Sequence, residues 1–136
     1  MGILDSTAII DLISRPQKPE RQRLESRLRK KLSAGEMLCT TQINVAEVLV
    51  GLHHSGNPPE RRALFDAILA TLVILELDAQ CAEHFGRIKA GLMVAGGVID
   101  DFDTMIAAIA LRHQQSVLTR NVKHFSRVPG LVVEDY

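Results

Sequence analysis

Aromatic residues, cysteines and long apolar runs are all scarce in this sequence of 136 residues. Tryptophan is absent and aromatic residues make up 4% of the chain, so the core must be built from Leu, Ile, Val and Ala. The longest apolar stretches, residues 72–75 and 105–111, are far too short to cross a bilayer. The first residues lack a basic segment followed by an apolar one. No signal peptide and no membrane association are therefore expected, and the cytoplasm is the expected location.

The residues that usually bind zinc or act as nucleophiles are not arranged for either task. Cys39 and Cys81 have neither the spacing of a disulfide framework nor that of zinc ligands, and their apolar neighbours predict buried free thiols. His53 and His54 are adjacent and the other three histidines are scattered. A Walker loop, a Gly-rich dinucleotide turn and a nucleophile elbow are also missing. Each absence removes one competing mechanism.

The net charge is formally zero, which argues against a simple nucleic-acid coat. The basic residues are nevertheless clustered, because eight of the sixteen Lys and Arg residues fall between Arg15 and Lys31. A second basic group lies near the end of the chain and consists of Arg112, Arg120, Lys123 and Arg127. Such a run is either a solvated helix face or a phosphate-binding rim. The second interpretation gains weight only if an RNA-directed site lies beside it.

Strand-like and helix-like segments alternate along the chain. The strand candidates are residues 2–4, 37–40, 72–75, 116–118 and 131–133. The helix candidates are residues 7–13, 20–32, 42–53, 58–71, 78–95 and 101–113. This alternation predicts an α/β domain with a mainly parallel sheet. Ligands of such sheets bind beyond the carboxyl ends of the strands, which is where Asp5 and residues 119–121 fall.

Two carboxylates stand where the sequence is otherwise apolar. Asp5 follows the first strand, and capping of the next helix would explain it, although Ser6 and Thr7 already offer hydroxyls for a cap. Glu47 lies among apolar neighbours in the helix predicted at residues 42–53. It is either exposed on a narrow polar seam or buried beside a cation, since a buried carboxylate without a partner is costly.

Three further aspartates open the helix predicted at residues 101–113. Asp100 or Asp101 can cap this helix. Asp103 is expected to point inward, because it lies one turn before the apolar Ile106. Oxygen ligands gathered at several strand ends suit Mg²⁺ or Mn²⁺, which proteins hold with a few carboxylates.

Four segments, taken in order and at their spacing, resemble the motifs of the PIN-domain nucleases. They are residues 3–7, 44–51, 102–108 and 118–125, and the ending from residue 125 to residue 136 is similar too. The resemblance is strongest to the VapC toxins of bacterial and archaeal toxin–antitoxin pairs. It spans residues 1–136 and implies a single PIN-like domain, a three-layer α/β/α sandwich with a central, mainly parallel sheet.

The resemblance also implies a Mg²⁺- or Mn²⁺-dependent endoribonuclease. Asp5, Glu47 and Asp103 match the three acids that hold the metal in this family, and Asn121 matches a fourth catalytic position that is aspartate in some members. Residues expected to act around the metal or the substrate are Ser6, Thr7, Thr119 and Arg120. Asp101 matches no family position securely and is expected to be a helix cap or an acid behind the metal ligands. The family further implies frequent homodimers and a VapB-like antitoxin whose tail covers the active site.

The expected reaction is hydrolysis of RNA phosphodiesters, with tRNA or ribosomal RNA as the substrate. Two alternatives stay open: a housekeeping PIN nuclease in RNA processing or on DNA, and a non-catalytic PIN-like module that binds RNA or a protein. Intact acids at the three main positions speak against a decayed site. Metal binding and cleavage would separate the enzymes from the binding module, and a neighbouring antitoxin gene would identify a toxin.

Overall fold

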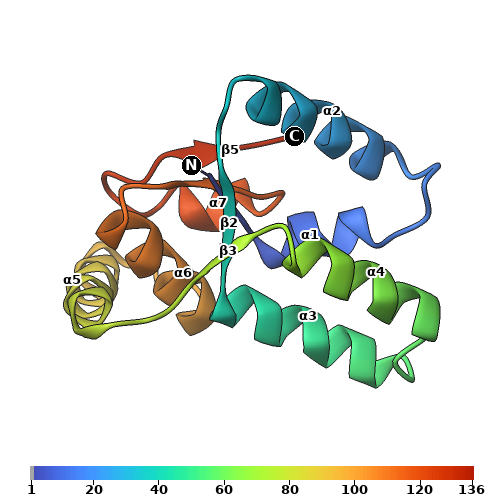
Figure 1. Ribbon diagram of the computed structural model, residues 1–136. Helices are drawn as coiled ribbons and strands as arrows, with labels where there is room; N and C mark the ends of the chain where they lie inside the picture. Colours follow the sequence, from blue (N-terminus) through green and yellow to red (C-terminus); the bar gives the residue numbers. More distant parts are fainter. Residues whose placement is uncertain (1) are drawn as a thin grey trace.

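The computed structural model describes residues 2–136 (Figure 1). Within these residues, five strands form one sheet in the order β3-β2-β1-β4-β5, and every neighbouring pair is parallel. The strands are β1 (Gly2–Leu4), β2 (Leu38–Thr41), β3 (Val73–Leu75), β4 (Ser116–Leu118) and β5 (Val133–Glu134). The predicted parallel α/β sheet is therefore confirmed.

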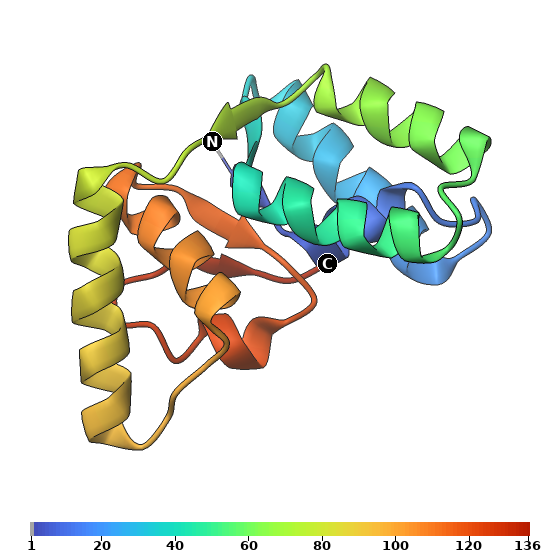
Figure 2. The ribbon, with the colours of Figure 1, turned by 90° about the horizontal axis from the view of Figure 1, so that it is seen from below.

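Helices cover both faces of the sheet. They are α1 (Ser6–Leu12), α2 (Pro19–Ser33), α3 (Gln42–His54), α4 (Pro59–Leu69), α5 (Ala79–Ala95), α6 (Asp101–Arg112) and α7 (Val122–Phe125). Figures 1 and 2 show α1 to α4 on one side of the sheet and α5 to α7 on the other. The predicted three-layer α/β/α sandwich is thus confirmed. Among residues 2–136, none of the helices has both the length and the apolar character that crossing a membrane requires.

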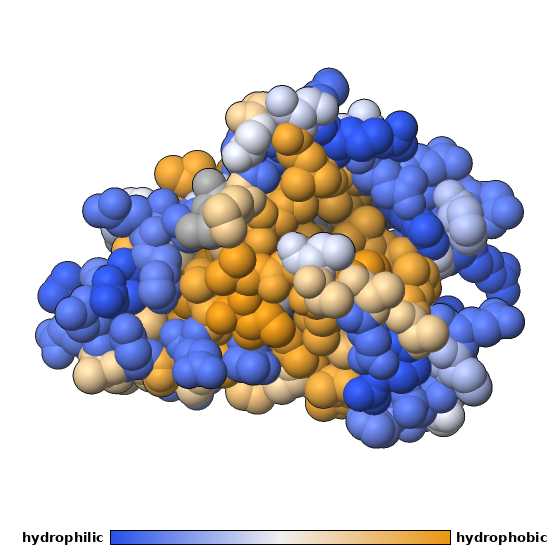
Figure 3. All heavy atoms as spheres, viewed as in Figure 1, coloured by the Kyte–Doolittle hydropathy of each residue, from blue (hydrophilic) through white to orange (hydrophobic). Residues whose placement is uncertain are grey.

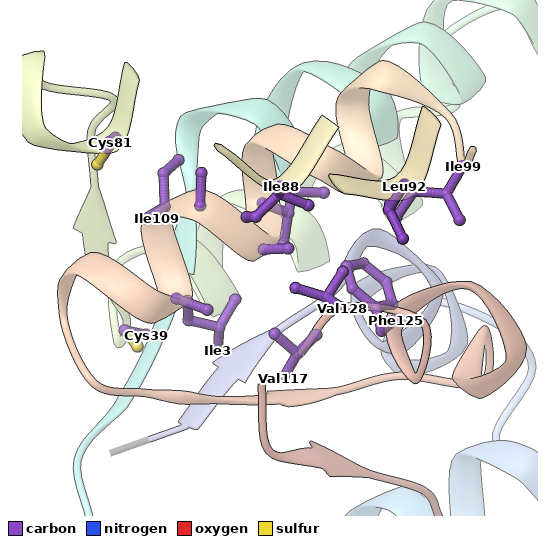
Figure 4. Close-up of a cluster of buried hydrophobic side chains, with 14 residues drawn as sticks. Ile3, Cys39, Cys81, Ile88, Leu92, Ile99, Ile109, Val117, Phe125 and Val128 are labelled. Atoms are coloured by element: carbon purple, nitrogen blue, oxygen red, sulfur yellow. The ribbon is translucent and has the colours of Figure 1, made fainter. Parts of the chain in front are cut away.

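Each face of the sheet has its own apolar core, because successive strand residues point to opposite sides. Ile3 and Val117 pack with Phe125 and with the apolar stripe of α5 (Figure 4). The next residues along the same strands, Leu4 and Leu118, face the layer of α1 to α4. Strands this short are stable here because both of their faces are covered.

The structure differs from the sequence-based expectation in two elements near the end of the chain. The short helix α7 was not predicted, and β5 begins at Val133 rather than at residue 131. The strand is displaced because Glu134 is held by Lys31 at 2.9 Å and by the Ser116 hydroxyl at 2.6 Å. Although burial opposes it, these contacts hold the pKa of Glu134 low, at about 2. Side-chain pairing, which the apolar pattern does not reveal, therefore sets the register.

The topology brings distant segments to one edge of the sheet. The central strand β1 lies between β2 and β4, so the order of the strands reverses there, and in such sheets ligands bind at this point. Asp5 follows β1 directly, α3 begins at the end of β2, and Thr119 follows β4. The helix α6 precedes β4, which places its first turn at the same edge. Residues separated by more than one hundred positions thus meet in one place.

The outermost strand at one side of the sheet, β3, leaves apolar side chains uncovered. Figure 3 shows them gathered across the middle of the face seen in Figure 1, where the edge strand β3 lies. Met37, Val73 and Leu77 are exposed by 59%, 39% and 43%. An edge strand with apolar neighbours can pair with or pack against another chain.

Candidate active site

Asp5 lies at the end of β1, in the middle of the carboxyl edge of the sheet. Its side chain is 2% exposed, and its Oδ2 accepts hydrogen bonds from the hydroxyls of Thr119 at 2.7 Å and Thr7 at 3.2 Å. Within residues 2–136, its Oδ1 is buried without a hydrogen-bond partner. Burial raises the pKa of this carboxyl. One carboxylate oxygen is therefore fixed by hydroxyls, and the other is free to bind a ligand.

Asp103 approaches the same edge from the first turn of α6. Its Oδ2 lies 3.0 Å from the amide nitrogen of Asn121 and 2.8 Å from Nδ1 of His124. Asn121 and His124 both belong to the turn that begins α7, and their facing nitrogens are 2.9 Å apart. With its proton on Nδ1, His124 is a second donor to the same carboxylate oxygen. Asn121, the fourth predicted catalytic residue, faces Asp103 through its amide nitrogen and donates to that carboxylate.

Glu47 completes the acidic cluster from α3, where it is partly buried. Its Oε1 is buried and has no hydrogen-bond partner in the described part of the chain. Burial and the negative charges of Asp5 and Asp103 raise the pKa of Glu47 to about 7, although the Ser6 hydroxyl partly opposes this shift. The structure therefore brings together the three acids that were singled out in the sequence, close enough for their charges to interact.

The other two aspartates at the start of α6 have different partners. Asp100 caps the helix, because its Oδ1 accepts a hydrogen bond from the backbone N–H of Phe102 at 2.8 Å. The predicted cap is thus confirmed. The Asp101 carboxylate binds the ammonium of Lys89 on α5 at 2.7 Å. The structure does not bring Asp101 into the acidic cluster.

Arg120 also turns away from the carboxylates. Its Nε binds Oδ2 of Asp11 at 2.7 Å, and Asp11 is fully buried. Asp11 also binds the Lys18 ammonium at 2.6 Å and the Tyr136 hydroxyl at 2.8 Å. Burial and the contact with Asp11 raise the pKa of Tyr136. At the site Arg120 contributes its backbone N–H, which donates to the Thr7 hydroxyl at 3.1 Å.

The basic run between residues 15 and 31 does not reach the acidic cluster. The Lys31 ammonium binds Glu134 and lies beside Gly2, so α2 ends at the amino edge of the sheet, opposite Asp5 (Figure 1). Three more cations of this run form ion pairs with acids, namely Lys18, Arg21 and Arg27. These pairs support the interpretation of a solvated, ion-paired helix face over that of a phosphate-binding rim.

The acidic cluster has the chemistry of a site for a hard divalent cation. The charges that act on Glu47 are those of Asp5, Asp103 and Asp100, all negative, and two buried carboxylate oxygens lack partners within residues 2–136. In the same part of the chain, no three acidic, imidazole or thiol side chains are yet close enough to enclose a cation. Binding of a cation would therefore have to draw the carboxylates of Asp5, Glu47 and Asp103 closer together. The residues fit such an ion because it would relieve their repulsion and occupy the free oxygens.

Two polar residues at this site were not singled out in the sequence. His124 lies three residues after Asn121, and Asn44 lies three residues before Glu47, so each pair stands on one helical turn. Asn44 is fully buried, and its Oδ1 accepts a hydrogen bond from the Ser6 N–H at 3.0 Å. Helical spacing from an already suspected residue could have identified both.

The parallel sheet and its edge of carboxylates define a PIN domain, and the family model described as "PIN domain" matches residues 2–131. Ribonuclease VapC2 of Haemophilus influenzae is 34% identical over 134 residues, which cover 98% of this chain and 96% of that protein. The tRNA(fMet)-specific endonuclease VapC of Salmonella typhimurium is 32% identical over 99 residues, which cover 73% and 75% of the two chains. The chain belongs to the VapC family of PIN-domain proteins.

A solved structure agrees with this assignment. The crystal structure of DNA-bound VapBC from Salmonella typhimurium contains a chain that is 31% identical, with a TM-score of 0.81. The match covers 99% of this chain and 98% of that chain. The fold therefore extends over nearly the whole sequence.

Proposed function

We propose that the protein is a Mg²⁺- or Mn²⁺-dependent endoribonuclease and the toxin of a toxin–antitoxin pair. The observation that carries this proposal is a pair of buried carboxylate oxygens, on Asp5 and Glu47, that lie at the carboxyl edge of a parallel sheet and have no hydrogen-bond partner within residues 2–136. The names of the similar proteins, ribonuclease VapC2 and tRNA(fMet)-specific endonuclease VapC, support RNA as the substrate and tRNA as its class.

Asp5, Glu47 and Asp103 would hold the cation, and the other polar residues would hold these acids in place. When bound, the cation neutralises charge on the scissile phosphate and lowers the pKa of water. Thr119 orients Asp5 through its hydroxyl, and His124 orients Asp103 through Nδ1. Lys123, exposed on α7 beside this site, is available to contact the RNA backbone.

Removal of the metal tests this function directly. Purified protein incubated with total tRNA and ribosomal RNA should give discrete fragments with Mg²⁺ or Mn²⁺ and none with EDTA. Gel electrophoresis and mapping of the fragment ends would identify the substrate class at the same time. Cleavage that persists in EDTA would contradict the proposed metal dependence. Folded, metal-loaded protein that cleaves neither tRNA nor ribosomal RNA would contradict the proposed activity.

Metal binding should depend on pH, because Glu47 holds a proton near neutrality. A pKa of about 7 means that this carboxyl is mostly protonated at pH 6 and mostly charged at pH 8. Since a ligating carboxylate must lose its proton, we expect Mn²⁺ affinity to fall about tenfold per pH unit below the pKa and to level off above it. Calorimetric titrations between about pH 5.5 and about pH 8 would measure this. In Glu47→Gln the affinity should be weaker and its dependence on pH shallower; an equally steep dependence in this variant would contradict the assignment.

We also propose a VapB-like antitoxin, a homodimer and a cytoplasmic location. The similar VapBC structure, whose name pairs VapB with VapC, supports the antitoxin. The exposed apolar residues Met37, Val73 and Leu77 beside β3 support contact with a second chain. The proposed RNA substrate supports a cytoplasmic location.

A further inference from the structure

The helix α1 has an unusual cap. Asp5 occupies the N-cap position, with extended backbone angles, yet its side chain accepts no capping hydrogen bond. Aspartate is among the residues that most often cap a helix through their own carboxylate. The amide of the first helical residue, Ser6, which an N-cap side chain does not normally reach, donates to Oδ1 of Asn44 at 3.0 Å. The acceptor comes from a different helix, 38 residues away along the chain.

Asn44 is itself held firmly in place. Its side chain is fully buried at the start of α3, and its backbone N–H donates to the Thr41 hydroxyl at 3.1 Å. It lies one turn before Glu47, so the same face of α3 carries the capping amide and one of the three acids. The amide also carries a buried nitrogen, Nδ2, that has no partner within residues 2–136. A residue selected for packing alone would not leave such a donor unsatisfied.

We propose that Asn44 is a positioning residue of the active site, which ties the first residue of α1 to α3 so that the carboxylates of Asp5 and Glu47 face the same cation. This inference rests on the proposed function and identifies a residue that serves the same site. The cap also joins the two elements that carry Asp5 and Glu47, so one hydrogen bond sets their relative position.

The side chain at position 44 must supply an oxygen to the Ser6 amide, and an asparagine does so without adding to the repulsion among the acids. An aspartate there could cap α1 equally well, but it would add another negative group beside Asp5 and Glu47, whose pKa values are already raised. An alanine would remove the cap altogether. The start of α1 would then be free to shift relative to α3. Asp5 and Glu47 would no longer be held in a fixed relative position for the cation.

Variants of Asn44 separate positioning from general stability. In Asn44→Ala we expect the Kd for Mn²⁺ to rise by about tenfold to a hundredfold, the usual effect of losing a residue that orients a metal ligand. Asn44→Asp keeps an oxygen for the Ser6 amide and should bind Mn²⁺ at least as tightly as the parent protein. Asp78→Ala is the control, because it removes a helix cap from the distant α5, where Asp78 accepts from the Cys81 N–H at 2.8 Å.

Two measurements on the full chain are needed: calorimetric titration with Mn²⁺, and hydrogen exchange of the Ser6 amide by NMR. The amide should be protected in the parent and in Asn44→Asp, and should lose protection in Asn44→Ala. If Asn44→Ala does not fold, Asn44→Ser replaces it, because its side chain is too short to reach the amide.

The proposal is overturned if Asn44→Ala binds Mn²⁺ like the parent, if Asn44→Asp binds as weakly as Asn44→Ala, or if Asp78→Ala has the same effect. A parent protein that binds no Mn²⁺ rejects the proposed function itself. The exchange of the Ser6 amide needs no metal, and in that case it would show that the cap exists but does not serve a metal site.

Discussion

Asp5→Asn is expected to reduce metal-dependent RNA cleavage by at least about a hundredfold to a thousandfold, the loss typical of removing one electrostatic contact to the reacting charge. The substitution replaces the free Oδ1, or the hydroxyl-bonded Oδ2, with a neutral NH₂ group of nearly the same size. The Thr119 hydroxyl can still bind the remaining oxygen, so the fold around position 5 should be kept. Initial rates of fragment release at saturating Mn²⁺ would measure the effect.

The same variant should be more stable than the parent when no metal is present. Burial and the charge of Asp103 raise the pKa of Asp5, which means that its charged form opposes folding. Well below the pKa that Asp5 has in the unfolded chain, its carboxyl is protonated in both states and this penalty is absent. The penalty grows as the pH rises through the raised pKa of the folded state. A neutral side chain should therefore stabilise the apo protein at neutral pH. Thermal unfolding with EDTA would show a higher Tm for Asp5→Asn, and added Mn²⁺ should raise the Tm of the parent more than that of the variant.

Asp66→Asn provides the control for both measurements, because Asp66 is exposed on α4 and its ion pair is with Arg62 in the same helix at 3.1 Å. It should cleave RNA at the parental rate. If Asp5→Asn retained more than about a tenth of the parental rate, Asp5 would not hold the cation that the reaction needs.

Asp11→Asn should be the most destabilising single change among the charged residues discussed, at about 3 kcal/mol. Asp11 is fully buried and binds three groups, the cations of Lys18 and Arg120 and the Tyr136 hydroxyl. Removing one partner from a buried ion pair commonly costs about 3–5 kcal/mol. The lower end applies here because Lys18 and Arg120 are 35% and 40% exposed and can regain water.

Urea unfolding at neutral pH would measure this loss as a lower midpoint with an unchanged m value. Asp66→Asn, which breaks an exposed pair within one helix, should change the free energy of unfolding by less than about 0.5 kcal/mol. Equal effects of the two variants would mean that the buried cluster contributes no more than an exposed ion pair.

The local pattern of the sequence was sufficient to predict most of the fold. Alternating strands and helices predict the layers, and each predicted element is present within a few residues of its observed bounds. The two differences arise where local pattern is weak. The helix α7 is four residues long, and the apolar run at residues 131–133 allows more than one register, which the contacts of Glu134 decide.

The acids of the site were also visible in the sequence, because a carboxylate amid apolar residues is anomalous by itself. Asp5 and Glu47 stand out in this way, and Asp103 stands out by its place one turn before the apolar Ile106. The residues that hold them do not, because their partners are distant along the chain: Asn44 contacts Ser6, and His124 contacts Asp103. An asparagine or a histidine in isolation has many uses, so only the folded structure shows which one applies.

The order in which the strands are added to the sheet has a consequence for the protein's own synthesis. The central strand β1 leaves the ribosome first, but one of its two neighbours, β4, begins at residue 116. The turn of α7 that holds Asp103 comes later still. A nascent chain therefore carries its first acid long before it can assemble the site. The proposed nuclease would be inert while it is being translated, and an antitoxin already present would have the whole of that interval to reach it before the first RNA is cut.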